Sequence, residues 1–461
     1  GWLASQSFFP GNAEKYSTVL VTEDADFATD IPEVNYSEIP FIDKDSAILL
    51  GNRTMGTMAD YVSQFEISDL YSQINYKGQP VRVSPLNYAD FFKWWANKDG
   101  GIPAYVIVNM STQDTEIVRL ENPIRYSDSD PFFYNVDRHM QLSYPFYMFD
   151  EKSFEINDDG EPFWIYPVQK RTIGLFGGTT IQRVVLCNAS TGECQDFAIE
   201  DVPQWVDRAY PAELLIEQYN WSGALSGGWI NSWLGQNGVK QTTPSTDGKS
   251  GFNYIAQDDD VWVYSGVTSA TADNSIIGCV MINQRTAESK FYSVAGATEE
   301  SAMRSAEGQV QHLQYDATFP LLINVDGQPT YFMALKDAAG LVKMYAMVDI
   351  QRYQNVAVGD TLAATEKSYK QLLVSQGINV GGSDASAHPS AGSTSGTIAS
   401  ISPVVLDGNS HYYLILDGQQ AIFDCPVASV VDVVRYKVGD VIVLNHGSSE
   451  GNVVLVDSIG E

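Results

Sequence analysis

Residues 185–194 read Val-Leu-Cys-Asn-Ala-Ser-Thr-Gly-Glu-Cys, an apolar strand that runs into an Asn- and Thr-containing turn. The same pattern occurs twice more, as Val106-Ile-Val-Asn-Met-Ser-Thr112 and as Val280-Met-Ile-Asn-Gln-Arg-Thr286. Asn and Thr favour turns because their side chains bond the local backbone, and Asn tolerates a positive φ. Each segment is therefore predicted to form a β-hairpin.

A second motif carries glycine, proline and an aromatic residue. It occurs as Gly101-Ile-Pro-Ala-Tyr105, Gly160-Glu-Pro-Phe-Trp164 and Gly327-Gln-Pro-Thr-Tyr331. The glycine turns the chain, the proline opens a strand and the aromatic side chain packs inward. Together the two motifs predict about four related units, near residues 75–125, 150–205, 250–300 and 320–360.

Helices are expected between these strands, where each could cover one face of a small sheet. The candidates are Thr57–Leu70, a segment opened by Ser84-Pro85, Pro203–Tyr219, a run opened by Thr298-Glu-Glu and Glu366–Leu373.

The chain divides into four stretches by composition. Residues 1–77 form an N-terminal segment with an amphipathic helix, and residues 78–375 form the array of related units. Residues 376–396 are rich in Gly and Ser and predict a flexible linker. In residues 397–461, the hairpin signal Asp417-Gly418 follows an apolar strand, which predicts a small barrel of OB or SH3 type. The expected fold class is α+β and β-rich: repeated small antiparallel sheet-plus-helix units, then this C-terminal β-barrel.

The charge balance excludes one class of partner. The 461 residues include 57 acids and 27 bases, a net charge of −30. Such a surface repels phosphate backbones, so nucleic acid is not expected as a partner, and an anionic membrane surface is disfavoured for the same reason. With only 18% charged residues, the polar composition is more typical of a secreted or surface protein than of a cytosolic enzyme.

No stretch approaches the roughly 20 apolar residues that span a bilayer. The sequence also begins with Gly1 rather than Met. We therefore expect the chain to start within a longer protein, with a membrane anchor outside it as the only membrane contact.

Two resemblances bear on function. The turn Asn188-Ala-Ser-Thr-Gly-Glu193 resembles the signature of PepSY-type modules, small helix-plus-sheet domains of bacterial surface proteins, with Asn in place of the usual Asp. The stretch from about Gly78 to Thr361 is similar to uncharacterised large membrane-anchored surface proteins of Gram-positive bacteria. The strings that carry this similarity include Gly174-Leu-Phe-Gly-Gly178 and Pro203-Gln-Trp-Val-Asp-Arg208. The resemblance implies an extracytoplasmic, cell-surface location and an upstream anchor, and it carries over no catalytic residue.

Motifs for catalysis are missing from the sequence. There is no Gly-x-Ser-x-Gly nucleophile elbow, and His139 has no partner motif beside it. No zinc-type cysteine spacing occurs. We therefore expect no catalytic residue, no enzyme activity and no cofactor.

Three groups of residues remain as candidates for binding or cross-linking. The acidic turn Asp258-Asp259-Asp260 could bind Ca²⁺ through its oxygens, although no EF-hand loop surrounds it, and solvated turn acids are the alternative. The indoles of Trp221, Trp229 and Trp233 could form a glycan platform or belong to a core. Cys187 and Cys194 would face each other across the predicted hairpin, so they could form a disulfide or remain two thiols.

These features predict a non-catalytic extracytoplasmic region that acts as a scaffold or interaction surface in the cell envelope, with a protein or glycan partner. The alternative is a ligand-binding or peptidase-regulating ectodomain for peptide, glycan or Ca²⁺. A third hypothesis is a cell-wall glycan hydrolase, which would need two close buried carboxylates with raised pKa values.

Overall fold

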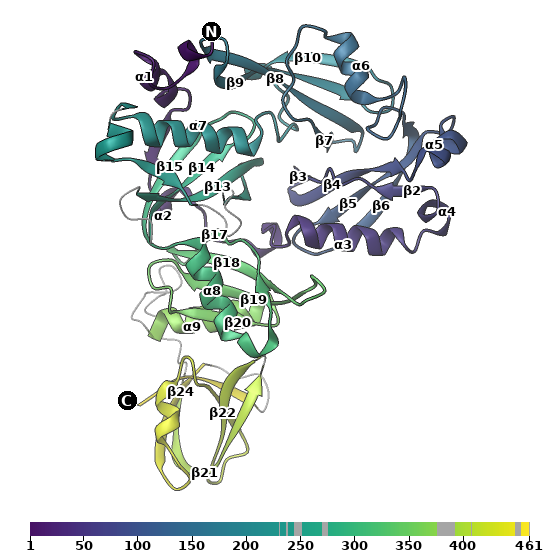
Figure 1. The fold of residues 1–461 in the computed structure, drawn as a ribbon. Coiled ribbons are helices and arrows are strands. Elements are labelled where there is room, and N and C mark those ends of the chain that lie inside the picture. Colours follow the sequence, from purple (N-terminus) through teal and green to yellow (C-terminus); the bar gives the residue numbers. More distant parts are fainter. Residues whose placement is uncertain are drawn as a thin grey trace. The chain divides into compact units, whose positions relative to one another are not determined.

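The computed structural model describes residues 1–229, 231–236, 238–243, 251–269, 275–375, 392–406, 408–447 and 453–460. The fold is α+β and β-rich, with several small sheets and the helices that accompany them (Figure 1). The chain divides into two compact units. The first holds Gly1–Asp30, Val34–Glu300 and Phe319–Leu322, and the second holds Ile31–Glu33, Ser301–Thr318 and Ile323–Glu461.

The first sheet has the strand order β2-β4-β5-β6, with β3 also paired to β4. Its strands are β2 (Phe65–Ile67), β3 (Ser72–Tyr76), β4 (Gln79–Tyr88), β5 (Ile102–Asn109) and β6 (Thr115–Ile124). Helix α3 (Lys44–Met55) contacts β5 and β6, and the Asp43 carboxylate caps its N-terminus by accepting a hydrogen bond from the Ser46 N–H at 2.9 Å.

Two helix predictions in this region are wrong in position. The segment predicted as one helix over Thr57–Leu70 holds the short helix α4 (Ala59–Val62) and then β2. Ser84 and Pro85 do not open a helix, because both pair with β5 inside β4. Helix α5 (Phe91–Asn97) begins later, where the Asp90 carboxylate accepts the Lys93 N–H at 2.9 Å.

The second sheet is an antiparallel meander of order β10-β9-β8-β7. Its strands are β7 (Ser153–Ile156), β8 (Pro162–Ile173), β9 (Gly177–Asn188) and β10 (Cys194–Ala198). Helix α6 (Val136–Ser143) precedes β7 in the chain.

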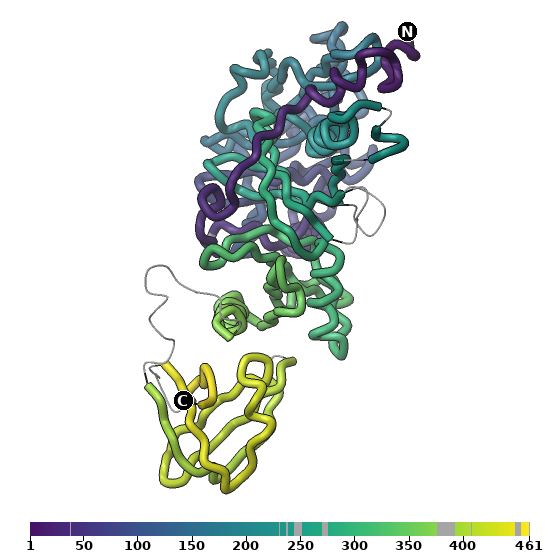
Figure 2. The backbone as a smooth tube through the Cα atoms, turned by 90° about the vertical axis from the view of Figure 1, so that its left-hand side faces the viewer, coloured from purple at the N-terminus to yellow at the C-terminus, as the bar shows by residue number. Residues whose placement is uncertain are grey.

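The third sheet joins the N-terminal segment to strands from residue 240 onward. It contains β11 (Lys240–Thr242), β12 (Asn253–Gln257), β13 (Asp260–Ser269), β14 (Ser275–Asn283) and β15 (Ser289–Ala297). Strand β1 (Thr22–Ala25) adds in parallel to β15, and Figure 2 shows this purple segment beside the green strands. Short helices α1 (Asn12–Ser17) and α2 (Phe27–Asp30) flank β1.

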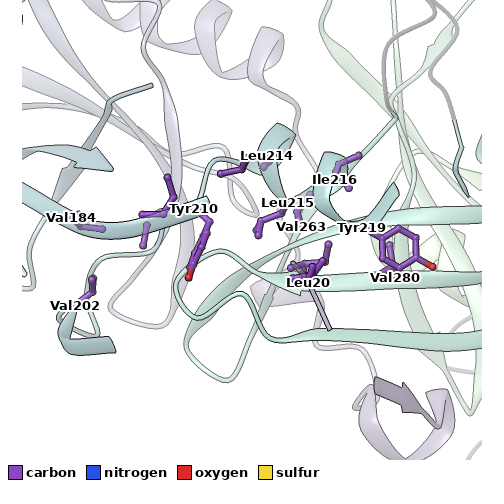
Figure 3. Close-up of a cluster of buried hydrophobic side chains, with 14 of the residues drawn as sticks. Leu20, Val184, Val202, Tyr210, Leu214, Leu215, Ile216, Tyr219, Val263 and Val280 are labelled. Atoms are coloured by element: carbon purple, nitrogen blue, oxygen red, sulfur yellow. The ribbon is translucent and has the colours of Figure 1, made fainter. Parts of the chain in front are cut away.

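Helix α7 (Ala212–Leu225) packs between the second and third sheets, with Glu213 and Glu217 exposed. Figure 3 shows Leu215 and Tyr219 of this helix together with Val184 of β9 and Val280 of β14 in one apolar cluster. A helix that packs against two sheets needs apolar side chains on more than one face, which is why Leu214, Leu215 and Ile216 follow one another in the sequence. Within the predicted segment Pro203–Tyr219, the helix starts only after Pro211.

The fourth sheet has the order β16-β18-β19-β20, with β17 paired to β18. Its strands are β16 (Asp316–Ala317), β17 (Leu321–Val325), β18 (Gln328–Lys336), β19 (Val342–Asp349) and β20 (Val356–Gly359). Helix α8 (Glu299–Gln309) precedes the sheet, and α9 (Leu362–Ser375) contacts β19 and β20. Both helices lie where the sequence predicts them.

The C-terminal strands close into a barrel of order β21-β22-β23-β25-β24 (Figures 1 and 2). These strands are β21 (Gly392–Leu406), β22 (Asn409–Leu416), β23 (Ile422–Pro426), β24 (Val441–His446) and β25 (Val453–Ile459). Of the predicted linker 376–396, residues 376–391 lie outside the described residues, and Gly392–Gly396 already belong to β21, paired with β24.

Short helical turns complete the described secondary structure: 3₁₀ turns at Leu3–Ser5, Tyr36–Glu38, Ile199–Asp201, Gln311–Leu313 and Val431–Arg435, and a π turn at Asn231–Gly235. Among the described helices, none has the length and apolar character needed to cross a membrane.

The three Asn-containing hairpins are present, and their turns close in the same way. In each turn the Asn Oδ1 accepts the backbone N–H of the second and third following residues, at 2.9 and 3.0 Å for Asn109, 2.9 and 3.1 Å for Asn188, and 2.8 and 3.2 Å for Asn283. The fourth following residue has a positive φ in every case: Gln113 at 66°, Gly192 at 76° and Ala287 at 61°.

The Gly-x-Pro motif is less uniform than the sequence suggests. Gly160 and Gly327 lie in the turns of the β7–β8 and β17–β18 hairpins, at φ of 77° and 82°. Gly101 instead joins α5 to β5, whereas Gly78, at φ 74°, occupies the equivalent β3–β4 turn. Both places demand a positive φ, so glycine alone does not distinguish them.

Candidate functional site

The β9–β10 hairpin places two cysteines opposite each other. Cys194 is in register with Cys187, and both are free thiols. The next pair of facing residues, Asn188 and Glu193, is hydrogen-bonded, because the Asn188 N–H donates to the Glu193 carbonyl at 2.9 Å. The cysteines therefore form the next, non-hydrogen-bonded pair, where facing side chains lie closest. Cys187 is buried, while Cys194 is half-buried.

Helix α6 brings a histidine to this pair. Its N-terminus is fixed by Asn135, whose Oδ1 accepts the Arg138 N–H at 3.1 Å. One turn later His139 Nε2 lies 3.7 Å from Cys194 Sγ, and Met140 Sδ lies 3.7 Å from the same sulfur. The ligand atoms of His139, Cys187 and Cys194 all lie within 4.8 Å of one another.

The imidazole is held by two contacts. His139 Nε2 lies 2.7 Å from the Gly192 carbonyl oxygen, which can only accept, so Nε2 carries a proton. The Tyr126 ring packs on the imidazole with centroids 4.4 Å apart. A Cβ on Gly192 would lie 2.4 Å from Tyr126 ring atoms, so only glycine fits at this position.

The two thiols differ in their acidity. A hydrogen bond from Cys187, together with the nearby His139, lowers the pKa of Cys194 to about 6, although partial burial opposes the shift. The same hydrogen bond and burial raise the pKa of Cys187. Cys194 is thus the more acidic of the two thiols.

Two kinds of chemistry suit such a cluster. Two sulfurs and an imidazole at this spacing could hold a soft metal ion. However, a metal needs a nitrogen lone pair, and the Nε2 atom that faces Cys194 is engaged as a donor to Gly192. The observed hydrogen bonds therefore favour thiol chemistry at Cys194.

The three residues of the acidic turn predicted as a Ca²⁺ candidate differ in their exposure and in their partners. Asp258 and Asp259 are exposed turn residues at φ 52° and 64°, and Asp259 Oδ1 accepts from Asn75 Nδ2 at 3.0 Å. Asp260 is only 4% exposed. Arg285 donates to both of its carboxylate oxygens at 2.9 Å.

Two further donors complete the surroundings of Asp260. Asn283 Nδ2 lies 2.9 Å from Oδ2, and Gln204 Nε2 lies 3.1 Å from Oδ1. With four donors around it, Asp260 is an ion-pair partner rather than an available cation ligand.

The three candidate tryptophans do not act as one group. Trp221 is half-buried and packs edge-on against Tyr16, with ring centroids 4.9 Å apart. Trp229 and Trp233 stack on each other at 5.9 Å and 13°, with 38% and 68% of their surfaces exposed. Of the three, only Trp229 and Trp233 are exposed.

A buried pair of carboxylates is also present. Glu155 accepts the backbone N–H groups of Asp207 and Arg208 at 2.9 and 3.1 Å, and Asp207 accepts the Asn75 N–H at 2.7 Å. Burial raises the pKa of Glu155 to about 7 and raises that of Asp207 well above its usual range. The carboxylates of Glu155 and Asp207 are fully buried and accept hydrogen bonds from backbone N–H groups of other segments. They therefore connect these segments and do not face a substrate.

An open cleft of about 660 Å³ lies between the first and second sheets. Its walls include Tyr76, Tyr105, Glu116, Glu121, Asp159 and Glu161. Tyr105 donates to the Gly160 carbonyl at 2.9 Å, which joins the two sheets at the cleft. None of the three candidate tryptophans lies among the described residues that line it.

Sequence reasoning missed His139 as a partner of Cys194. The two residues are 55 positions apart, on helix α6 and strand β10, and strands β7, β8 and β9 lie between them in the chain. The only local signal is the helix-capping Asn135 just before His139, which fixes a helix but not what it faces.

Comparisons with known proteins leave the family open. No family model matches the chain, and no curated protein matches it. Among solved structures, cobalt-substituted Synechocystis ACO is similar at 7% identity and a TM-score of 0.13, over 63% of this chain and 47% of that one. The chain thus spans less than half of that protein's length.

Two other solved structures cover more of the chain. A protein of unknown function from Dyadobacter fermentans is 11% identical, with a TM-score of 0.19 over 79% of this chain and 93% of that one. An exo-beta-1,3-galactanase from Phanerochaete chrysosporium is 9% identical, with a TM-score of 0.19 over 76% and 78%. At these TM-scores none of the three similarities carries a functional argument.

Proposed function

We propose that this chain is a non-catalytic extracytoplasmic region of a membrane-anchored bacterial surface protein, and that it acts as a scaffold or interaction surface in the cell envelope. In this proposal the sheets are repeated PepSY-like α+β units, and the C-terminal barrel is an OB- or SH3-like module. The partner is a protein or a glycan.

The observation that carries the proposal is the shared hydrogen bonding of the turns at Asn109, Asn188 and Asn283. Three sheets of one chain close a hairpin with the same acceptor, the same donors and the same positive-φ position. Repeated units supply length and surface area, which suits a spacer or docking platform.

The surface chemistry agrees with this proposal. A net charge of −30 on 461 residues favours solubility and disfavours non-specific attachment to other anionic polymers. A scaffold in the envelope benefits from both properties.

Protease treatment of intact cells tests the location. An antibody to this chain would follow its digestion when protease is added outside, with a cytoplasmic protein of the same cells as the control. We expect the chain to be cleaved while the cytoplasmic control stays intact. Cleavage only after lysis would contradict the proposal.

A ligand-binding ectodomain is the second candidate, and the cleft between the first two sheets favours it. Four of its wall residues are acidic, namely Glu116, Glu121, Asp159 and Glu161, against the two bases Lys77 and Arg119. Such walls suit a peptide with basic side chains.

Calorimetric titration with a short oligolysine peptide tests this candidate. We expect Glu116→Gln to weaken binding about fivefold, since an exposed ion pair contributes up to about 1 kcal/mol. Glu200→Gln is the matched control, because Glu200 is exposed and is not among the residues of the cleft. Equal affinity for both variants would show that the cleft is not the binding site.

A further inference from the structure

The cysteine pair of the β9–β10 hairpin differs from the other cysteines of the chain. Cys279 and Cys425 are fully buried, and burial raises the pKa of both thiols, that of Cys425 to about 12. Cys194 is half-buried and has three polar or sulfur neighbours within 3.7 Å: His139 Nε2, Met140 Sδ and the Gly192 carbonyl. A half-buried cysteine beside an imidazole is the arrangement expected of a reactive thiol.

Cys187 supplies what such a thiol needs to complete an exchange reaction. It is directly opposite Cys194 at a non-hydrogen-bonded position, where two cysteines can be bridged. It is also fully buried, so an external reagent reaches Cys194 first. One sulfur is therefore placed to attack and the other to resolve.

We propose that Cys187 and Cys194 form a redox-active dithiol that exchanges with small-molecule disulfides of the glutathione type, with His139 as the positioning residue. This inference does not depend on where the protein resides or on its role as a scaffold.

The exchange proceeds in two balanced steps. The Cys194 thiolate attacks one sulfur of the external disulfide, so a Cys194–S–S–R bond forms and one thiolate, RS⁻, leaves. Cys187 then loses its proton to the departing thiolate and attacks Cys194 Sγ. The Cys187–Cys194 disulfide forms, the second RS⁻ leaves, and the external disulfide is reduced by two electrons while the protein dithiol is oxidised.

The charged and titratable groups around Cys194 support this division of roles. Cys187 and His139 favour its thiolate, while Glu193 opposes it. Asp196, on the same strand, is paired with Arg183 at 2.8 Å. Tyr126 and Tyr144 remain neutral near the site, because burial raises the pKa of both phenols.

Trapping the mixed disulfide tests the first step. The Cys187→Ser variant of the full chain, treated with oxidised glutathione, should accumulate one glutathione on Cys194, found by peptide mass spectrometry. The wild-type chain should instead release the glutathione and show the Cys187–Cys194 cross-link. Cys279 and Cys425 serve as internal controls and should stay unmodified.

The pH profile of alkylation tests the positioning role of His139. In the wild-type chain, Cys194 should react with iodoacetamide about fourfold faster at pH 7 than an ordinary thiol of pKa near 9, since a larger thiolate fraction outweighs lower intrinsic nucleophilicity. His139→Gln keeps a donor for Gly192 but removes the imidazole that lowers the pKa of Cys194, so the midpoint of the profile should move to higher pH. A purely structural histidine would leave that midpoint unchanged.

Two outcomes would overturn the inference. If the Cys187–Cys194 bridge forms but survives excess reduced glutathione in the folded protein, it is a structural disulfide. If the purified chain carries one equivalent of zinc, and each of Cys187→Ser, Cys194→Ser and His139→Gln loses it, the cluster is a metal site. Circular dichroism of each variant would establish that the fold is retained.

Discussion

Replacing Asp260 with Asn should destabilise the third sheet by about 3 kcal/mol. Asp260 is 4% exposed and pairs with both Nε and Nη2 of Arg285 at 2.9 Å. Removing one partner of a buried ion pair costs about 3–5 kcal/mol, because the other charge stays buried without compensation. Arg285 keeps a side-chain exposure of 20%, which places the cost at the lower end of that range.

The amide introduced by Asp260→Asn would add a second unfavourable contact. Its NH₂ group would face donors from Arg285 and Asn283, where the carboxylate now accepts. The hydrogen bonds that Arg285 donates to Asp260 raise the pKa of its guanidinium. The guanidinium remains charged when its partner is neutralised, because its ordinary pKa already lies far above neutral pH.

Asp258→Asn is the matched control. It removes the same charge two residues away at an exposed position, and Asn tolerates the φ of 52° found there. We expect its free energy of unfolding to stay within about 0.5 kcal/mol of the wild type.

Urea unfolding combined with hydrogen exchange measures the difference. Urea is uncharged and leaves the ion pair unscreened, and exchange at the amides of β13 reports the third sheet directly. Equal stability of the Asp260→Asn and Asp258→Asn variants would refute the ion-pair reasoning. A Ca²⁺-dependent rise in stability that both variants lose would show instead that the turn binds the cation.

The remaining predictions concern the core, a turn and a buried acid. Leu215→Ala should cost about 3 kcal/mol in urea unfolding, whereas Leu142→Ala, at a position 77% exposed, should change little. Asn188→Ala removes the acceptor of two backbone N–H groups and should cost about 1 kcal/mol; Asn283→Ala should cost the same if the turns are equivalent. Burial raises the pKa of Glu155 from 4.5 to about 7, so the folded state holds this proton more tightly than the unfolded chain. The free energy of unfolding should therefore fall as the pH rises from about 4.5 to 7, and Glu155→Gln should flatten that slope. If Glu155→Gln leaves the pH dependence of the free energy of unfolding unchanged, the prediction for Glu155 is wrong.

The sequence predicted the hairpins because the interactions that define them are local. The Asn188 side chain bonds residues only two and three positions ahead, so the four letters Asn-Ala-Ser-Thr contain both side-chain hydrogen bonds of the turn. The same holds for the helices α8 and α9, which lie where their sequences place them.

The prediction failed where a local helix signal lies inside a strand. Ser84-Pro85 is typical of a helix start, but these two residues pair with Val106 and Tyr105 of strand β5. Pairing with a strand beyond helix α5 decided the outcome, and no short window of sequence contains both partners.

The sequence by itself determined the β-rich fold class and the three Asn turns. It also determined that Cys187 and Cys194 lie opposite each other in their hairpin. Only the tertiary structure decided what surrounds those residues. It brought His139 to Cys194 from 55 residues away and gave Asp260 its partner Arg285 from 25 residues away. Thiol reactivity and charge pairing depend on distances between residues that are far apart in the sequence. The packing of separate helices and strands sets these distances, so the spacing of residues in the sequence does not predict them.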